Sequence, residues 1–532
     1  MPHCVFEFGG SGRSVRVDWR ASLGPVGTVC KGLSLALLLP AAVAVVYGDD
    51  LIVFLATAAL AAGLGVALER LEPEPDLGDR EGFLMVASTW LVVALIGAVP
   101  YLLAGMGSPS TLAHPVNALF ESMSGFTTTG ATVMGEISFR RHSHALLLWR
   151  QLTQWLGGMG IVVLAVAILP ELSVGGAQLM DAEAPGPGIE KLTPRIAETA
   201  RVLWMVYAAI TALEILLLYG LHLAGLAPNM DAYNAVAHGL TTMPTGGFSP
   251  EARSIEAFSG AVQWLIVPFM IAAGTNFAMF WWLLRGRTDE VLDDTEFNAY
   301  LGLLGTLAAV VAGVLFLGPG IAPGADVGAE FLSGYLEIPG DPEAAARHAV
   351  FQVVSIVTTT GYASMDFNAW SAPLQYLLLF GMFVGGSAGS TGGAVKIVRW
   401  VVVIKSVRRE LFTTVHPDAV STVRLAGEPI DERAIRGIHA FTLLYLVCFA
   451  VGVVLVMLDA TRVGTDLSTL EGMAAVAATL GNVGPGFGAL GPMNSYLGFS
   501  PVSKLLMVFL MWVGRLEILP VFVLLTRSYW RS

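Results

Sequence analysis

The sequence predicts an all-α polytopic membrane protein, and three observations support this fold class. The 532-residue chain is 55% hydrophobic and 13% charged, whereas soluble globular domains carry about 25% charged residues. Its mean hydropathy is +0.68. Ten apolar runs are long enough to cross a bilayer, at about 29–47, 51–68, 82–104, 144–169, 200–225, 257–284, 299–318, 373–401, 437–459 and 502–526. Together these features exclude a disordered chain, a secreted disulfide scaffold and an ordinary cytosolic enzyme.

The first two runs form a helical hairpin, because only Gly48, Asp49 and Asp50 separate them. Pro40 lies inside the first run and is expected to kink it. Basic residues precede this run, but no small-residue cleavage site follows it before the next span. The N-terminus is therefore not a signal peptide.

The placement of Lys and Arg sets the orientation of the spans. With the N-terminus inside, 21 of the 29 basic residues fall in cytoplasmic segments and six in external ones. Since cytoplasmic segments of membrane proteins are enriched in Lys and Arg, we expect a multi-pass protein of the plasma membrane with both termini in the cytoplasm.

The eight remaining runs form four pairs, each enclosing a short amphipathic stretch and a Thr/Gly cluster. The clusters lie in the segments NALFESMSGFTTTGAT, NAVAHGLTTMPTGGF, HAVFQVVSIVTTTGYA and LEGMAAVAATLGNVGPGFG. Aligned on Gly130, Gly246, Gly361 and Gly484, they recur at intervals of 116, 115 and 123 residues. A fixed period of this kind indicates a duplicated unit.

The repeat divides the chain into five parts. A cytoplasmic N-terminus and two-helix hairpin at 1–80 precedes four pore repeats, at 81–190, 191–290, 291–430 and 431–532. Each repeat is a span, a short helix, a glycine-centred turn and a second span. The third repeat also contains the interrupted run described below.

Four such turns are expected to meet around one pseudo-fourfold axis. Irregular backbone at membrane depth survives only where it is buried in protein or lines water. Carbonyl groups on such an axis replace the hydration shell of a cation, and glycine allows the left-handed backbone that this requires. The short helices would direct the negative ends of their dipoles at the ion. The residues thus predict a pore for a monovalent cation.

These motifs, together with GGSAGSTGGAVK and GRLEI, resemble the Trk/Ktr/HKT superfamily of cation transporters and, within it, the TrkH/TrkG potassium-uptake subunits. The resemblance covers nearly the whole chain, and the N-terminal hairpin is similar to TrkH. It implies a carbonyl-lined filter that binds K⁺ as the transported ion, with glycine at all four positions favouring K⁺ over Na⁺. The implied filter residues are Thr128, Thr129, Gly130, Ala131, Pro244, Thr245, Gly246, Gly247, Thr359, Thr360, Gly361, Tyr362, Asn482, Val483, Gly484 and Pro485. The fourth loop departs most from the pattern, with Asn482 and Val483 in place of threonine.

A glycine-rich segment interrupts the eighth run. Five glycines in nine residues cannot hold a stable helix, so this segment should be unwound in mid-span and line the pathway or lie buried. It lacks the GxxxxGK[ST] pattern of a nucleotide-binding loop. The resemblance implies an intramembrane gate below the filter, formed by Gly385, Gly386, Ser387, Ala388, Gly389, Ser390, Thr391, Gly392 and Gly393.

Arg515 is an ionisable residue within the last span, and such residues are functional by default. The resemblance places it in the pore beside the gate, as an electrostatic barrier. The alternative is a structural contact with Glu517 or with a backbone carbonyl. Lys396 is either a further pathway charge or the cytoplasmic end of its helix, and Glu121 is expected to bond to neighbouring backbone.

The function predicted is channel-like potassium uptake, without enzymatic activity or a covalently bound cofactor. The alternatives are a Na⁺ or mixed Na⁺/K⁺ transporter and a membrane-embedded enzyme. No HExxH, paired Asp or Ser/His/Asp grouping lies in the spans, and the carboxylates at 289–296 are expected to be a solvated surface. The net charge of −12 leaves no basic groove for nucleic acid. The resemblance implies a TrkA-type RCK/KTN nucleotide-binding cytosolic subunit as partner, and a homodimer.

Overall fold

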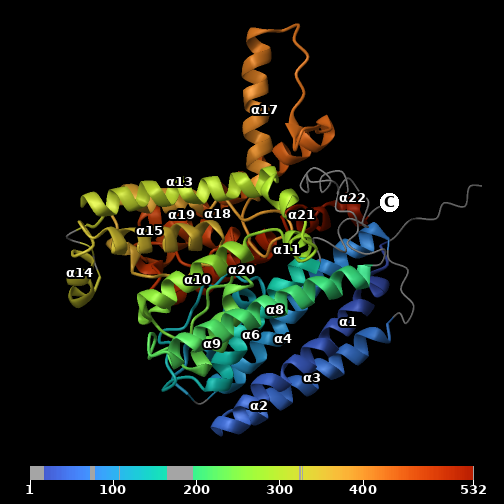
Figure 1. Ribbon diagram of the computed structural model, residues 1–532. Helices are drawn as coiled ribbons and strands as arrows, with labels where there is room; N and C mark the ends of the chain where they lie inside the picture. The colour runs from blue at the N-terminus through green and yellow to red at the C-terminus, as the bar shows by residue number, and fades with distance from the viewer. Residues whose placement is uncertain are drawn as a thin grey trace, which may run out of the picture.

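The computed structural model describes residues 17–71, 78–106, 108–163, 196–322, 325 and 327–530, and these residues are predominantly helical (Figure 1). Within these ranges six helical segments are long and apolar enough to cross a membrane. They are Trp19–Tyr47, Leu51–Glu69, Arg80–Gly105, Ala200–Leu223, Thr295–Leu317 and Glu432–Val463. A bent pair, α10 (Gly260–Ala273) and α11 (Phe277–Leu284), makes a seventh when counted as one span. The fold class predicted from the sequence is confirmed.

The N-terminal hairpin lies along one side of the molecule, drawn in blue in Figure 1. It comprises α1 (Trp19–Ala36), α2 (Leu38–Tyr47) and α3 (Leu51–Glu69). The first run is interrupted at Leu37, three residues before Pro40, where the proline ring opposes continuation of the helix. Gly27 and Gly65 bring α1 and α3 together so closely that a Cβ on either would lie within 2.7 Å of the other's carbonyl oxygen. Small residues permit this approach of two spans.

Four helix–loop–helix units follow the hairpin. Their first helices are α4 (Asp79–Gly105), α8 (Ile196–Leu223), α13 (Thr295–Leu317) and α18 (Glu432–Val463). Their short helices are α5 (Pro115–Phe126), α9 (Ala232–Thr242), α15 (Pro342–Val357) and α19 (Thr469–Leu480). Each short helix is capped by the side chain of the residue before it, namely His114, Asp231, Asp341 and Ser468. With 11 to 16 residues, they are shorter than the roughly 20 residues that a spanning helix needs.

The second helices of the units are more irregular than the first. They are α6 (His144–Val163), the bent pair α10 and α11, α16 (Ala372–Gly381) leading to α17 (Ile397–Val415), and α20 (Pro501–Arg515) leading to α21 (Leu519–Leu524). The axes of α10 and α11 differ by 97°. The runs predicted at 257–284 and 502–526 are therefore broken rather than continuous. The breaks fall at Gly274–Asn276, where Asn276 caps α11, and at Glu517 and Ile518, whose φ angles are positive.

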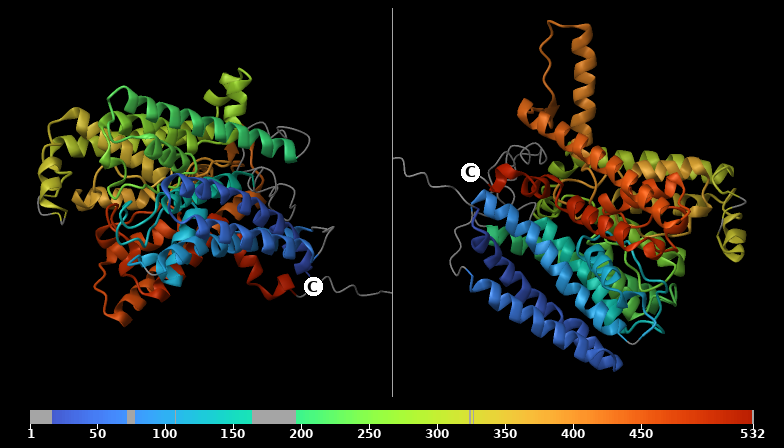
Figure 2. Two further views of the ribbon diagram at one scale, coloured as in Figure 1. Left: turned by 90° about the horizontal axis from the view of Figure 1, so that it is seen from below. Right: turned by 180° about the vertical axis from the view of Figure 1, so that it is seen from behind.

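Helix α17 stands away from the rest of the molecule (Figures 1 and 2). The loop expected from about 402 to 436 is helical as far as Val415, and then forms a small hairpin of β1 (Arg424–Leu425) and β2 (Glu428–Pro429). The shorter helices α12 (Thr288–Leu292), α14 (Ala329–Tyr335) and α22 (Arg527–Trp530) complete the described structure.

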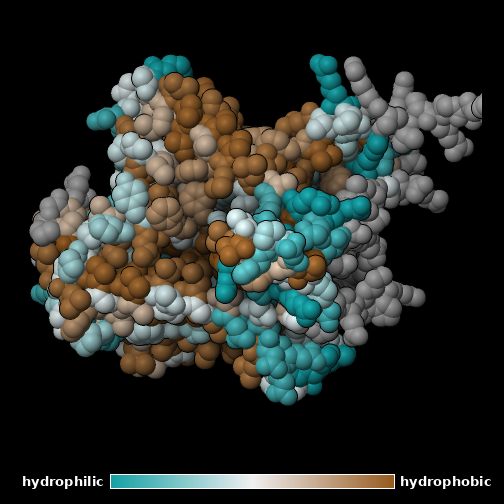
Figure 3. Space-filling view, turned by 90° about the horizontal axis from the view of Figure 1, so that it is seen from above, coloured by the Kyte–Doolittle hydropathy of each residue, from teal (hydrophilic) through white to brown (hydrophobic). Residues whose placement is uncertain are grey.

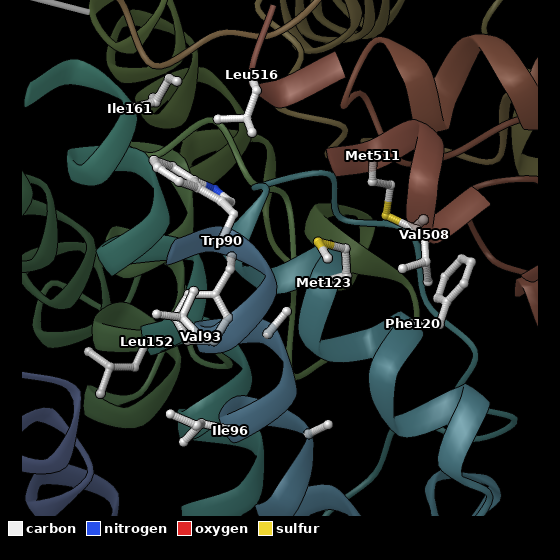
Figure 4. Packing of buried hydrophobic residues seen from close by; sticks show 14 of the residues in the cluster. Trp90, Val93, Ile96, Phe120, Met123, Leu152, Ile161, Val508, Met511 and Leu516 are labelled. Carbon is white, nitrogen blue, oxygen red and sulfur yellow. The ribbon is translucent and has the colours of Figure 1, made fainter. Parts of the chain in front are cut away.

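Hydrophobic side chains cover much of the face drawn in Figure 3, as expected for a protein surrounded by lipid. Inside, side chains from α4, α5, α6 and α20 belong to one core, which includes Trp90, Phe120, Leu152 and Met511 (Figure 4). The first unit therefore packs against the fourth, although the two lie at opposite ends of the repeat.

Candidate functional site

The four glycine-rich loops share one backbone geometry. In each, the residue two before a glycine has a positive φ: 53° at Thr128, 55° at Thr245, 61° at Thr359 and 52° at Asn482. The glycines themselves have φ of 79° at Gly130, 75° at Gly247, 79° at Gly361 and 105° at Gly484. Between them lies a residue whose N–H donates to the short helix, in the pairs Thr129–Ser124, Gly246–Thr241, Thr360–Ser355 and Val483–Ala478, at 2.8–2.9 Å.

This geometry corrects the register of the second loop. The glycine equivalent to Gly130, Gly361 and Gly484 is Gly247, and the alignment on Gly246 was wrong by one residue. The intervals between equivalent glycines become 117, 114 and 123 residues. Two adjacent glycines in PTGGF leave the register undetermined from sequence, whereas the left-handed φ distinguishes them.

The loops close into a ring in chain order. A Cβ added to each of the four glycines would lie no more than 2.5 Å from the carbonyl oxygen of the next loop. These pairs are Gly130 with Gly246, Gly247 with Thr360, Gly361 with Val483 and Gly484 with Thr129. Because each carbonyl belongs to the residue before the next glycine, the same contact recurs four times. A side chain at any of these positions would collide with backbone, so glycine is required there twice over, for φ and for space.

One side of the ring opens into a cavity of about 320 Å³, which all four ring glycines line. Ala131 and Pro485 also line this cavity, together with the carboxylates Glu136 and Glu251. Hydrogen bonds from Ser138 (2.7 Å) and Arg141 (2.9 Å) hold the pKa of Glu136 below its ordinary value. Glu136 is therefore ionised at neutral pH, and its ion pair with Arg141 offsets its charge at the mouth of the ring.

A buried ion pair bonds to the backbone just after the first and second loops. Arg150 Nε donates to Glu121 Oε1 at 2.6 Å, and both side chains are at most 2% exposed. Glu121 also accepts from the backbone N–H of Val133 (2.9 Å), just after the first loop, as expected from the sequence. Arg150 Nη1 donates to Ser249 O (2.9 Å), just after the second loop. The pair thus links two neighbouring loops.

Other buried side chains fix individual loop carbonyls and amides. Gln154 donates to Gly246 O (2.6 Å) and accepts from Phe248 N (3.1 Å). Asn482 donates to Thr129 Oγ1 and to Met511 O, both at 3.0 Å. The hydroxyl of Tyr362 bonds to Thr241 Oγ1 at 2.5 Å. Sequence reasoning did not single out Gln154, because its partners lie 92 and 94 residues away.

The glycine-rich segment 385–393 lies next to the ring, against the ends of three of the short helices. Its Gly393 N–H donates to Thr359 Oγ1 (2.8 Å), and Thr391 Oγ1 donates to Met243 O (3.0 Å). A Cβ on Gly393 would meet Gly481 O. The segment therefore touches the ends of the second, third and fourth short helices.

The same segment is anchored to the broken helix pair beneath it. Ser387 N donates to Gly274 O (2.8 Å), and Phe277 N donates to Gly389 O (3.1 Å). Glu296 Oε1 accepts from Ala388 N (2.8 Å) and is only 2% exposed. The expectation that all carboxylates at 289–296 are solvated is therefore wrong for Glu296, which begins α13 and faces inward.

Arg515 lies between the segment 385–393 and α6 of the first unit, and together with the segment it forms a layer next to the ring. Its Nη1 donates to Thr391 O at 2.7 Å and its Nη2 to Gly157 O at 3.4 Å, and the side chain is 2% exposed. Lys396 Nζ donates to Gly392 O at 2.5 Å, so it lies at the segment rather than at an exposed helix end. Glu517 pairs with Arg399 at 2.5 Å. Arg515 thus contacts backbone carbonyls, and one of them, Thr391 O, belongs to the segment 385–393, whereas the other, Gly157 O, belongs to α6.

Comparisons with known proteins agree with this architecture. The family model for TrkH, described as a cation transport protein, matches residues 52–318 and 338–531. The Trk system potassium uptake protein TrkH of Escherichia coli is 36% identical over 97% of this chain and 100% of its own length, and TrkG of the same organism is 33% identical over 94% and 96%. The crystal structure of the potassium transporter TrkH from Vibrio parahaemolyticus superposes with a TM-score of 0.81 at 32% identity, covering 97% of this chain and all of that one.

Proposed function

The chain belongs to the TrkH family of cation transport proteins, and we propose that it carries K⁺ across the cell membrane through the ring of four loops. Members of this family are transporters rather than enzymes. One contact that recurs four times supports the proposal most directly. In it, each ring glycine lies against the carbonyl oxygen of the residue that precedes the ring glycine of the next loop. Carbonyl oxygens gathered at one axis can replace the hydration shell of a cation.

The short helices add to this electrostatic environment. They end at Phe126, Thr242, Val357 and Leu480, each within five residues of its ring glycine. A helix C-terminus carries a partial negative charge, so four such ends near one axis favour a cation there. The transported ion is K⁺, because the relatives are named potassium uptake proteins and all four ring positions are glycine.

The segment 385–393 and Arg515 form the gate in this proposal. Thr391 and Gly393 contact the ends of two short helices, and Arg515 donates to Thr391 O, which supports a gate directly next to the ring. A guanidinium group opposes a permeating cation, and its field is strong where water is excluded. Movement of the segment away from the axis would open the pathway.

We propose further that the protein is a homodimer and works with a TrkA-type nucleotide-binding subunit on the cytoplasmic side. The relatives are named as parts of a Trk system, which supports an assembly of several subunits. The projecting helix α17 exposes an apolar stripe, formed by Ile404, Leu411 and Val415 at 57–71% exposure, which a second copy would cover. Replacing Leu411 and Val415 with Asp should convert the dimer into a monomer in native mass spectrometry.

Ion flux into proteoliposomes tests the function. We expect uptake of K⁺ and Rb⁺ well above that of Na⁺ and Li⁺. Equal uptake of Na⁺ and K⁺ would favour a mixed transporter, and preference for Na⁺ would contradict the proposed substrate. Absence of any flux from folded protein, with the cytosolic subunit and nucleotide added, would contradict transport itself.

Thiol labelling tests the proposed orientation. Ala252 is exposed and lines the cavity at the ring. Val420, at 97% exposure, lies after α17 on the expected cytoplasmic side. Ala252→Cys should react only with an impermeant reagent outside and Val420→Cys only after permeabilisation. The opposite pattern would invert the topology.

A further inference from the structure

A large apolar cavity lies between the N-terminal hairpin and the first two units. Its volume is about 590 Å³, and it is lined by residues of α1, α4, α6 and α8 together with Phe126 at the end of α5. The lining includes Val29, Leu33, Val93 and Leu156. Three of the elements around it, α1, α4 and α8, are long and apolar enough to span a membrane, so we expect hydrocarbon rather than water around the cavity.

The cavity is poorly suited to water. Its lining side chains are apolar except for the Thr89 hydroxyl, which already donates to Met85 O at 2.7 Å, and the indole N–H groups of Trp90 and Trp204. A buried water needs two to four polar partners, and apolar cavities stay dry or bind apolar ligands. A cavity of about 150 Å³ admits benzene, so this one accommodates a ligand about four times larger, which is the scale of a lipid chain.

One buried donor in the lining lacks an acceptor. Trp90 is 7% exposed, and its Nε1 has no hydrogen-bond partner among the residues that the structure describes. It lies beside Val93 on α4 (Figure 4). Burying an indole N–H without a partner is unfavourable, so an occupant that carries an oxygen acceptor fits better than a plain hydrocarbon does.

A basic residue precedes the part of α8 that lines the cavity. Exposed Arg201 precedes the lining residue Trp204 by three positions on α8, and residues at this spacing share a helix face. Arg201 stands at the beginning of the span Ala200–Leu223, at the level of the membrane surface. In a phospholipid the phosphate lies nearest the membrane surface and the ester carbonyl lies deeper. A phosphate at Arg201 and an ester carbonyl in the cavity would have this order.

From these features we propose that the cavity binds one acyl chain of a membrane phospholipid, with the lipid phosphate at Arg201 and an ester carbonyl accepting from Trp90 Nε1. The chain would pack on Phe126 and Gly157. The site is separate from the ion pathway, although Gly157 O is also an acceptor for Arg515. The proposal does not depend on which cation the protein carries.

The test uses two matched glycines. Gly32 lines the cavity and Gly63 does not, and a Cβ on either would meet nothing within 4 Å. Gly32→Phe should fill the cavity, while Gly63→Phe makes the same change of residue in the same hairpin. The full-length protein is reconstituted in vesicles containing phosphatidylglycerol brominated in its acyl chains, which quenches tryptophan on contact. The part of the quenching that Trp90→Phe removes is the signal of the site.

We expect this signal in wild type and in Gly63→Phe, and its loss in Gly32→Phe. Arg201→Gln should weaken binding about fivefold, since a basic residue near a lipid surface contributes about 1 kcal/mol. Native mass spectrometry should show one retained lipid fewer in Gly32→Phe than in Gly63→Phe. Equal quenching and equal lipid retention in the two glycine variants would overturn the proposal. Binding insensitive to Arg201→Gln would overturn its assignment to a phospholipid headgroup.

Discussion

The ring and the layer next to it, formed by the segment 385–393 and Arg515, differ in symmetry. Each loop of the ring repeats one set of φ angles, one hydrogen bond to its short helix and one contact with the next loop. The layer beneath contains a single copy of each part: the segment 385–393 from the third unit and Arg515 from the fourth. In the proposed function, the repeated region would offer a symmetric environment to an ion on the axis, while the unrepeated region would allow control by one moving element.

The second helices of the first and fourth units show how the layer departs from the ring's symmetry. Gly157 and Gly514 occupy equivalent places, since a Cβ on either would overlap the carbonyl oxygen four residues before a ring glycine, at Phe126 and Leu480. The residue that follows is Gly158 in one helix and Arg515 in the other. Gly158 packs against Pro244, whereas Arg515 reaches Thr391 O. A single substitution at a repeated position thus places a charge where the other unit has a close packing contact.

The largest expected effect concerns the ion pair behind the ring. Glu121→Gln leaves Arg150 buried without a counter-charge, and breaking a buried pair in this way costs about 3–5 kcal/mol. The exposed pair Glu136–Arg141 on the following loop provides the control, because Glu136→Gln should cost less than about 1 kcal/mol. Thermal unfolding in detergent measures both. The double variant Glu121→Gln with Arg150→Met should recover much of the loss, and similar stability of the two Gln variants would contradict this role.

The register of the ring is tested next. Gly247→Ala introduces a side chain at a positive φ and against Thr360 O, so we expect a penalty of about 2 kcal/mol and about a thirtyfold loss of K⁺ over Na⁺ selectivity. Gly464→Ala is the control, since Gly464 has φ of 74° with nothing within 4 Å of its Cβ. Gly246→Ala meets only the Gln154 side chain and should be milder. A stronger effect at Gly246 than at Gly247 would contradict this register and favour the alignment on Gly246.

The asymmetric layer is tested through Arg515. A unit charge about 10 Å from a cation at an effective dielectric near 20 contributes about 1.7 kcal/mol. Arg515→Ala should therefore raise ⁸⁶Rb⁺ uptake by roughly tenfold or more. Lys504→Met, on the same helix but bonded to Asn117 Oδ1, is the matched control and should leave uptake near the wild-type rate.

Deleting Ser387–Gly392 should open the same barrier, because it removes backbone from the inner side of the ring. The combination with Arg515→Ala should be less than additive, since both changes act on one contact, from Arg515 to Thr391. Uptake at or below wild type in both single variants, with protein that is well folded by thermal unfolding, would place the barrier elsewhere.

The last prediction compares two glutamines on α6. Gln154 donates to Gly246 O and accepts from Phe248 N, whereas neither side-chain atom of Gln151 has a partner among the described residues. Both side chains are fully buried. Gln154→Leu should lower the unfolding free energy by about 1 kcal/mol for each lost bond and reduce K⁺ selectivity. Gln151→Leu should be neutral or stabilising. Equal effects of the two variants would mean that Gln154 is only a packing residue.

The sequence predicted those features that depend on local composition or on repetition. The hairpin at Gly48–Asp50, the four short helices and the unwound segment 385–393 follow from apolar runs, turn residues and glycine content. The register at Gly247 did not, because a sequence pattern cannot tell two adjacent glycines apart, whereas the positive φ of Gly247 and its contact with Thr360 O do. The inward position of Glu296 and the role of Gln154 also escaped prediction, since each acts on backbone about 92 residues away in the chain.

The order in which the ring closes has a consequence for synthesis of the protein. The last contact joins Gly484 to Thr129 O, across 355 residues of chain. At about 5–20 residues per second, translation of that interval takes about 20–70 s, during which the first loop has no partner on one side. A polypeptide that ends before the fourth loop therefore has three loops and an open side instead of a ring. If the ring is the ion pathway as proposed, incomplete chains in the membrane would lack a sealed path, and conduction would begin only when the last unit has been inserted.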